Sequence, residues 1–412
     1  MYPSLHRLAA QGQEIRVGLA GTGFMAQGIA NQLGKTPGIS LAFVGGRNIE
    51  AAEQAARRAA AHSGMQTAWG NDAAELLQSC PVDVLIEATC SVGAGLRHCM
   101  AALEHGAHLV LANTELDLAM GDWLATRANA HGRVCTSDSG DQHGVLARLV
   151  DECRLFGMRP VLAGNIKGFL NPEARAEELG HEAAIRGISA QQCCAFTDGT
   201  KLNIEMALLA NGCGFRPLCT GMQGPRATDV HEALECFDLD AMPPEGAVDY
   251  LLGAEPGGGV FVIGECTDPF QRDYLRYLKL GDGPYYVLPR AYHLCPMETA
   301  HAVAAAVLEG RPVLQPGAHR RSEVYAFAKR SLRAGEPITQ PVGGDQLYGR
   351  IADASLAEHA DLVPLLALEP AGGESAVVSR DVIAGQPLRQ DALVPPATPV
   401  WQWRMRGIPP AP

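Results

Sequence analysis

The chain has 412 residues, of which 47% are hydrophobic and 19% are charged, and its net charge at pH 7 is -12. This length suits two or three domains of an ordinary globular protein. The acidic balance argues against nucleic acid or an anionic membrane as the main partner. Because no apolar run of about 20 residues occurs, no transmembrane helix is predicted.

The N-terminal segment lacks the apolar core of a secretory signal, so we expect a cytoplasmic protein. The 12 cysteines are scattered and form no C-x-x-C pair, so we expect buried, reduced thiols. The carboxylates Asp141, Glu205 and Asp229 have no spacing diagnostic of a metal site, and we predict none.

The first predicted elements surround a glycine-rich turn. Residues 14–20 read as a buried strand, the residues up to about Leu33 read as a helix, and the turn between them satisfies G-x-G-x-x-[GA]. The two glycines allow a tight turn and a close approach to a pyrophosphate, and the helix N-terminus offers free N–H groups to the phosphates. We therefore predict a dinucleotide site. Its predicted contacts are Gly21, Thr22, Gly23, Phe24, Met25 and Ala26.

The second predicted strand, at residues 40–46, determines which dinucleotide is expected. NAD enzymes usually carry an acidic residue at this point for the ribose 2′-OH, whereas this chain has Arg47 and Asn48. A cation in place of the carboxylate favours a 2′-phosphate and hence NADP(H). The alternative that Arg47 is a solvated loop residue stays open.

Helices and strands continue to alternate up to about residue 140, which predicts a doubly wound parallel sheet. Ligands of such sheets bind beyond the carboxyl ends of the strands. We expect Thr89 and Asn113 to border the nicotinamide, although ordinary turn chemistry explains them equally well. The predicted segments are helices at 49–63, 93–106 and 121–132 and strands at 82–89, 108–115 and 133–140.

Beyond residue 144 the alternation stops. Helices are predicted at 144–157 and 296–310, and strands at 258–266 and 284–290. This pattern fits an α+β domain that covers the cofactor and supplies the catalytic acid and base.

The segment DGTKLNIEMALLANG, which starts at Asp198, carries the predicted catalytic residues. Lys201 lies in the first turn of a helix, where the dipole should lower its pKa, and Glu205 follows at i+4. A lysine beside a carbonyl is a suitable proton donor for hydride transfer, with Asp198 or Glu205 orienting it. The alternative is a capped helix with a surface ion pair.

The last 90 or so residues contain a duplication. YAFAKRSLRAGEPI aligns with AVVSRDVIAGQPL, so that Arg330 matches Arg380 and Leu332 matches Val382. The repeat predicts a small, pseudo-symmetric β-rich domain. Its two arginines either meet an anionic ligand or serve the turns and an interface.

Segments along almost the whole chain resemble homoserine-dehydrogenase-like oxidoreductases with a C-terminal SAF (antifreeze-like) domain. Within this group the chain is similar to enzymes called DRL, which rearrange and reduce deoxyxylulose phosphate to methylerythritol phosphate with NADPH. The resemblance implies homo-oligomers, dimers or tetramers. The matching segments are GLAGTGFMAQGIA, EATCSVGAGLRHCMAALEHGAHLVLANTELDLAMG, SGDQHG, FTDGTKLNIEMALLANGCG, YHLCPMETAHAVAAAVLEGRP, FAKRSLRAGEP and VVSRDVIAGQPL.

Three positions depart from the family pattern. Thr114 stands where homoserine dehydrogenases have a lysine, which argues against homoserine oxidation. Asp198 and Lys201 resemble the catalytic Asp and Lys of those enzymes with one residue fewer between them. His143 stands where a proline is expected. The predicted contacts of a small, anionic substrate are Asp141, Gln142, Lys167, Arg290 and His293.

The predicted architecture is α/β, with a Rossmann domain at 1–150, a central α+β domain for catalysis and oligomerisation at 151–315 and a SAF-like β-rich domain at 316–412. The predicted function is NADPH-dependent reduction of a small phosphorylated or carboxylated carbonyl compound, with DRL-type reductoisomerase activity as its most specific form. The alternatives are a homoserine or other amino-acid dehydrogenase, and a non-catalytic cofactor-binding sensor.

Overall fold

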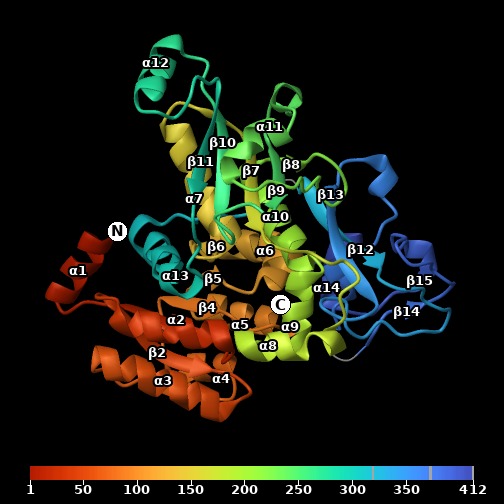
Figure 1. Cartoon of the computed structure of the whole chain (residues 1–412). Coiled ribbons are helices and arrows are strands. Elements are labelled where there is room, and N and C mark those ends of the chain that lie inside the picture. The colour runs from red at the N-terminus through yellow and green to blue at the C-terminus, as the bar shows by residue number, and fades with distance from the viewer. Residues whose placement is uncertain (318–319, 371–373, 411–412) are drawn as a thin grey trace.

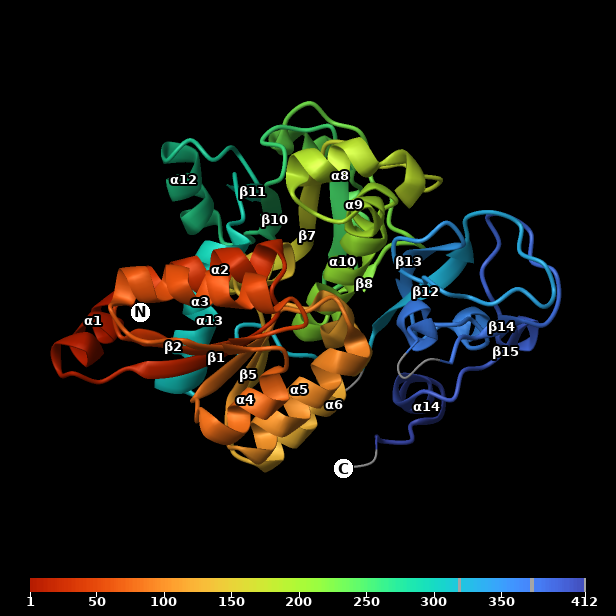
Figure 2. The same cartoon turned by 90° about the horizontal axis from the view of Figure 1, so that it is seen from below.

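The computed structural model describes residues 1–317, 320–370 and 374–410. It shows a parallel sheet between helices, a second mixed sheet, and a C-terminal part of short strand pairs that lies beside the second sheet (Figures 1 and 2). None of the helices in these ranges has the length and apolar character needed to cross a membrane.

The N-terminal sheet has six parallel strands in the order β3-β2-β1-β4-β5-β6. This is the order of a doubly wound dinucleotide-binding sheet, whose strand order reverses between β1 and β4. The structure confirms the predicted parallel sheet and adds β3, a short edge strand that the alternation did not reveal. The strands are β1 (Ile15–Ala20), β2 (Ile39–Gly45), β3 (Ala68–Gly70), β4 (Val84–Glu87), β5 (His108–Leu111) and β6 (Cys135–Ser137).

Helices cover both faces of this sheet, which explains why its strands are almost continuously apolar. One face packs against α2 and α3, and the other against α4, α5 and α6. The helix predicted at 121–132 begins earlier, because the side chain of Asn113 accepts a hydrogen bond from Leu116 N at 3.0 Å and caps it. The helices are α1 (Tyr2–Ala10), α2 (Phe24–Lys35), α3 (Ile49–Ser63), α4 (Ala73–Ser79), α5 (Val92–Glu104) and α6 (Thr114–Ala130).

The predicted helix near residue 300 returns to the N-terminal sheet. It is α13 (Cys295–Ala304), followed by a π-helical turn, η4 (Ala305–Glu309), and it packs on α2. Gly28 allows this approach, because a Cβ on it would lie 2.7 Å from Pro296 Cβ. Residues near 300 therefore help to form the core of the N-terminal part.

The central sheet has the order β11-β10-β7-β9-β8. One face packs against α7 and α10, and the other against the short helices between β8 and β9. The helix α12 projects away from the rest of the molecule (Figure 1). The elements are β7 (Arg159–Lys167), β8 (Arg216–Pro217), β9 (Ala247–Leu252), β10 (Val260–Glu265), β11 (Tyr285–Arg290), α7 (Gln142–Leu155), α10 (Thr200–Cys213), η2 (Val230–Glu232), α11 (Ala233–Cys236), η3 (Leu239–Ala241) and α12 (Pro269–Tyr277).

Two helices between β7 and α10 were not predicted. After the 3₁₀ turn η1 (Ala176–Glu178), α8 spans Gly180–Arg186 and α9 spans Ala190–Thr197. Ser189 and Gln192 form a capping box that starts α9. This sequence signal of a helix start was present but was not used.

The C-terminal part confirms the pseudo-symmetry of the repeat. Leu332 and Val382 face each other and exchange backbone hydrogen bonds of 2.8 and 3.0 Å. Two further bonds are symmetry mates, since Gly335 N donates to Val378 O at 2.8 Å and Gly385 N donates to Ala328 O at 2.7 Å. The elements are β12 (Ser322–Ala328), β13 (Leu347–Asp353), η5 (Ala357–His359), η6 (Leu365–Leu368), β14 (Val377–Val378), η7 (Gln390–Ala392), β15 (Leu393–Val394) and α14 (Pro399–Arg406).

Candidate active site

The glycine turn between β1 and α2 has the geometry of a dinucleotide cradle. Gly21 has φ +128°, and a Cβ on it would lie 2.5 Å from Ala88 O, so only glycine fits there. A Cβ on Gly23 would meet nothing within 4 Å, which leaves open space before the N-terminus of α2. Ala26 is fully buried against the sheet. These residues fit a pyrophosphate on the free N–H groups of the helix.

The side chains around this turn differ in exposure. Thr22 is half-buried beside Gly46, whereas Phe24 and Met25 are 60% and 41% exposed. Arg47 is exposed and stands two residues after the end of β2. The side chain of Asn48 caps α3 by accepting a hydrogen bond from Ala51 N at 3.0 Å.

Thr89 and Asn113 follow β4 and β5 at the carboxyl edge of the sheet, and both side chains serve the local backbone. The hydroxyl of Thr89 donates to Glu87 Oε1 at 2.6 Å. Asn113 is 1% exposed, caps α6, and donates to Ser91 O at 3.3 Å. Their side chains therefore hold the loops at the carboxyl edge of the sheet, and contacts with a nicotinamide stay a prediction.

The α8–α9 segment lies over this edge. Gly187, at the end of α8, lies against the ring of Phe24, since a Cβ on it would come within 3.6 Å of Phe24 Cδ2. Gln192 Nε2 lies 2.9 Å from Cys90 Sγ in the loop after β4. Residues between β7 and α10 thus cover the cofactor loops from the side opposite the sheet.

Lys201 reaches from α10 to the carboxyl edge of the N-terminal sheet. Its ammonium donates to Thr114 Oγ1 and, at 2.8 Å, to Glu115 Oε1, and its side chain remains 16% exposed. Burial works to lower the pKa of Lys201, but nearby carboxylates, above all Glu115 and then Asp141, hold the pKa above its usual value. The prediction of a lowered pKa is therefore wrong, because it considered the helix dipole without Glu115.

Glu205 does not form the expected ion pair with Lys201. Its carboxylate instead lies 3.7 Å from Lys167 Nζ and accepts a hydrogen bond from Asn165 Nδ2 at 3.2 Å. Gln142 Oε1 joins this group by accepting hydrogen bonds from Lys167 Nζ at 2.9 Å and from Asn165. Burial raises the pKa of Glu205, and Lys167 opposes that rise.

Asp141 is close enough to Lys201, His143 and His293 for their charges to influence its carboxylate. Burial works to raise its pKa, but the positive charges around it, from His143, Lys201 and His293, hold that pKa below its usual value. His143 is fully buried, neither ring nitrogen has a partner within the described ranges, and burial lowers its pKa. His293 is half-buried, with Nδ1 2.8 Å from Gly258 O.

Arg290 is held by a carboxylate on α13. Its Nη2 donates to Glu298 Oε2 at 2.8 Å, and Arg148 donates to the same oxygen. The guanidinium of Arg290 also lies 5.4 Å from the ring centroid of Tyr292. Any anion bound by Arg290 therefore has to compete with Glu298.

Asp198 occupies a different environment from the one predicted. It makes no contact with Lys201 in the part of the chain that the structure describes, and pairs instead with Lys329 Nζ at 2.8 Å. Its other oxygen accepts a hydrogen bond from Thr200 N at 2.8 Å. The expectation that Asp198 orients Lys201 directly is corrected, because Glu115 and Thr114 do so.

Within residues 1–317, 320–370 and 374–410, no three or more His, Cys, Asp and Glu side chains come together as a group that could hold a metal ion. Lys201, Asp141, Glu205 and Lys167 form a cluster of ionisable groups that influence one another's charge.

Comparison with known families agrees with these two features. Residues 21–136 match the homoserine dehydrogenase NAD-binding domain, and residues 140–299 match the catalytic domain of the oxidoreductase DRL. The chain is an NAD(P)-binding oxidoreductase that joins these two domains. The predicted enzyme class is confirmed, while the predicted resemblance of residues 316–412 to a SAF domain lies outside both matches.

No curated protein sequence matches this oxidoreductase significantly. Solved structures with a similar fold include a myo-inositol dehydrogenase from Lactobacillus casei in complex with NAD(H) and myo-inositol, at 17% identity and a TM-score of 0.41 over 68% of this chain and 75% of that chain. A dehydrogenase from Chromobacterium violaceum is 12% identical, with a TM-score of 0.45 over 73% of this chain and 90% of that chain. A probable dehydrogenase from Thermotoga maritima is also 12% identical, with a TM-score of 0.44 over 72% of this chain and 90% of that chain. Likeness at this level does not bear on the substrate.

Several contacts of the oxidoreductase site were not predicted from the sequence. Glu115 was predicted as the last residue of a strand, whereas it lies in the first turn of α6 and holds Lys201. Asn165 lies inside an apolar strand, where a buried amide is unusual enough to be noticed. Lys329 stands just before Arg330 in the repeat, and its pairing with Asp198 has no local signature.

Proposed function

We propose that this oxidoreductase uses NADPH to reduce the carbonyl group of a small, hydroxyl-bearing, anionic compound, with Lys201 as proton donor. The observation that carries the proposal is the position of the Lys201 ammonium. Thr114 and Glu115 hold it at the carboxyl edge of the cofactor sheet, and Asp141 lies close enough to influence its charge.

The chemistry follows from the charge states of these groups. When bound, NADPH would supply a hydride to the carbonyl carbon, and the carbonyl oxygen would become an alkoxide. Lys201 is charged at neutral pH because its pKa is raised, so it stabilises the developing negative charge and delivers a proton to that oxygen. Glu115 then faces a neutral amine, which a proton from solvent recharges, since both side chains are partly exposed.

Two observations support NADPH and an anionic substrate. Arg47 is exposed where NAD enzymes usually carry an acid, so it is free to meet a 2′-phosphate. Lys167 belongs to the cluster and His293 acts on the charge of Asp141, and both are partly exposed, so they are available to a phosphate or carboxylate.

The more specific proposal is a DRL-type reductoisomerase, which the match of residues 140–299 favours. It is tested by incubating the protein with NADPH and 1-deoxy-D-xylulose 5-phosphate and analysing the product for 2-C-methyl-D-erythritol 4-phosphate. Oxidation of NADPH with other phosphorylated or carboxylated hydroxy-carbonyl compounds alone would leave the reductase proposal standing and remove the isomerase step.

The role of Lys201 is tested by Lys201→Ala, with the exposed Lys35→Ala as control. We expect kcat to fall about 100-fold or more in the first variant, in line with the loss of a general acid, and to stay unchanged in the second. NADPH affinity should change little in both, since Lys201 lies away from the glycine turn. Unchanged turnover in Lys201→Ala would remove the lysine from the mechanism.

A further inference from the structure

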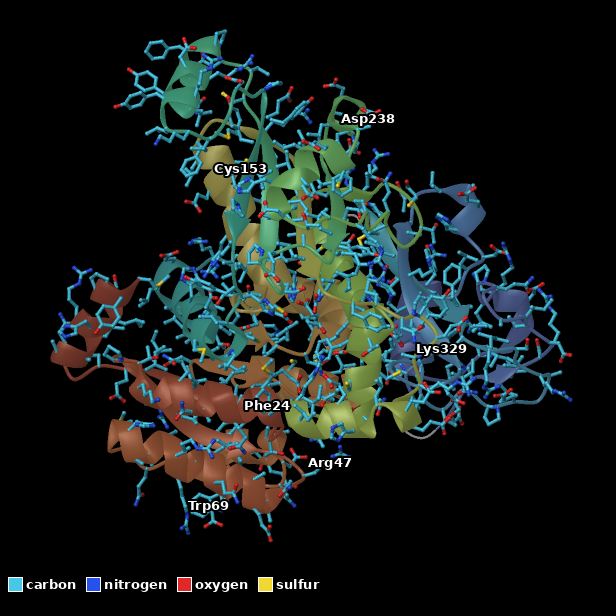
Figure 3. All side chains as sticks on the ribbon, viewed as in Figure 1. Phe24, Arg47, Trp69, Cys153, Asp238 and Lys329 are labelled. Carbon is cyan, nitrogen blue, oxygen red and sulfur yellow. The ribbon has the colours of Figure 1, made fainter. Side chains whose placement is uncertain are left out.

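Lys329 joins the C-terminal part to the start of α10. The residue follows β12, and its side chain is only 2% exposed. Figure 3 places it where the C-terminal part meets the helices of the central part. Its ammonium donates to Ala174 O at 2.8 Å, to Gly344 O at 2.7 Å and to Asp198 Oδ2 at 2.8 Å.

These three oxygens match the three donors of the ammonium, and Cys194 Sγ lies 3.3 Å from the same nitrogen as a further contact. A lysine buried to this degree is costly unless it is paired and fully hydrogen-bonded. Since the acceptors come from three separate segments of the chain, the charge holds those segments in one relative position. The contacts of Lys329 therefore fix the segments around Ala174, Asp198 and Gly344 relative to one another.

Asp198 links Lys329 to the start of α10, the helix that carries Lys201. While Oδ2 faces Lys329, Oδ1 accepts a hydrogen bond from Thr200 N, the first residue of α10, at 2.8 Å. The next residue is Lys201. The position of the Lys329 charge thus determines the orientation of Asp198, which determines where the helix begins.

The hairpin of β12 and β13 holds the same helix along its length. Thr200 Oγ1 accepts a hydrogen bond from Gly349 N at 2.9 Å, and Asn203 Oδ1 accepts one from Ile351 N at 2.8 Å. Helical spacing places these side chains on a different face from Lys201 and Glu205. One face of α10 thus docks on the C-terminal part, while another carries the proposed site.

We propose that Lys329 is a positioning residue for Lys201, so that the C-terminal part completes the active site from behind α10. The inference rests on the proposed role of Lys201. Its physical reason is the short reach of a hydrogen bond: Lys201 Nζ lies 2.8 Å from Glu115 Oε1, and a displacement of about 1 Å at the start of α10 would break that contact.

The test compares Lys329→Met with the double variant Asp198→Asn/Lys329→Met, which removes both buried charges. Arg380→Met is the matched control, because Arg380 is an exposed cation of the same repeat and pairs with Asp391. The readout is the rate at which acetic anhydride acylates Lys201 as a function of pH, measured by mass spectrometry relative to the exposed Lys35. This measurement needs no substrate, and the affinity for NADPH is measured alongside it.

In Lys329→Met we expect Lys201 to lose its contact with Glu115 and its pKa to fall, so that acylation at pH 8 becomes about threefold faster or more. With a substrate that the wild type reduces, kcat should fall about tenfold, while KM and the affinity for NADPH should stay unchanged. The double variant should show the same changes, and Arg380→Met none. If Lys329→Met is too unstable to purify, the acylation rate of Lys201 in the double variant tests the proposal instead.

Wild-type acylation of Lys201 in either folded Lys329 variant would overturn the proposal. A separate result would show that the proposed function is wrong. Lys201→Ala with full turnover would remove the catalytic role of Lys201, while the acylation of Lys201 would still report whether Lys329 positions it.

Discussion

Arg47 is the residue on which the choice between NADPH and NADH depends most directly. It is exposed, follows β2, and stands where an acidic residue would bind a ribose 2′-OH. A guanidinium recognises a phosphate with two parallel hydrogen bonds, so its contribution should be specific to NADPH.

The variant Arg47→Glu tests this assignment. Because the new carboxylate repels the 2′-phosphate, we expect the dissociation constant of NADPH to rise at least about tenfold, while that of NADH falls or holds. Fluorescence titration of both coenzymes measures the effect. The control is Arg57→Glu on the exposed side of α3, where Arg57 pairs with Glu53 at 2.6 Å. Equal affinities of the wild type for NADH and NADPH would contradict the assignment.

The buried carboxyl group of Asp117 should make the free energy of unfolding depend on pH. It is 2% exposed and accepts a hydrogen bond from Ser137 Oγ at 2.5 Å, and burial raises its pKa from 3.8 to about 7. Below about pH 4 the carboxyl is protonated in the folded and the unfolded chain and has no effect. As the pH rises from about 4 to 7, the unfolded chain releases its proton first, so the folded state loses stability.

Asp117→Asn should remove this contribution, which corresponds to about 2–3 kcal/mol between pH 5 and pH 8. The unfolding free energy from urea titrations should therefore fall less with pH in the variant than in the wild type. Asp391→Asn, at an exposed site, is the control. Identical pH profiles of Asp117→Asn and the wild type would show that burial does not raise the pKa of Asp117.

At the scale of elements, the turn between β1 and α2 depends on backbone geometry. Gly21 and Gly64 both have positive φ, at +128° and +72°, but only at Gly21 would a Cβ meet another atom, Ala88 O. An alanine at Gly64 therefore tests the effect of positive φ alone. An alanine at Gly21 adds the steric clash with Ala88 O, next to β4.

We expect Gly21→Ala to weaken NADPH binding about 100-fold or more, because the turn has to move away from β4. Gly64→Ala should keep the affinity and cost about 1 kcal/mol of stability, the usual price of alanine at positive φ. Calorimetric titration with NADPH and thermal unfolding distinguish the two. Wild-type affinity in Gly21→Ala would show that this turn does not hold the pyrophosphate.

Elements with strong local signals were predicted from the sequence, and elements determined by distant contacts were not. The glycine turn, α3 at 49–63 and the repeat around Leu332 and Val382 each carry their pattern within a short stretch. The helix α9 does carry a local signal, the capping box of Ser189 and Gln192, which the prediction missed. The edge strand β3 and the helix α8 span only 3 and 7 residues, too few for a clear periodic pattern. Their positions depend on neighbours that the chain reaches only after folding.

The candidate site shows the same division. That Lys201 belongs in it was predicted, because a lysine in the first turn of a helix needs an explanation. Its partner Glu115 lies on another helix, and the partner of Asp198 lies beyond β12. No local pattern links these residues, so the sequence predicted pairs among residues 198–205, whereas the fold pairs Lys201 and Asp198 with residues far away along the chain.

At the scale of the whole molecule, the N-terminal, central and C-terminal parts share one hydrophobic core, and α10 lies between them. Lys201 connects α10 to the cofactor sheet, and Asn211 connects it to the C-terminal part by donating to Ser322 O at 3.0 Å. This arrangement explains how a residue of the C-terminal repeat could influence chemistry at the carboxyl edge of the first sheet.

A crystal structure of the NADPH complex tests the central claim most directly. We expect the pyrophosphate to lie at Gly23 before α2, the 2′-phosphate to contact Arg47, and C4 of the nicotinamide to face the space beside Lys201 and Asp141. A nicotinamide that points away from this cluster, with Lys201 out of reach of a carbonyl placed against C4, would contradict it.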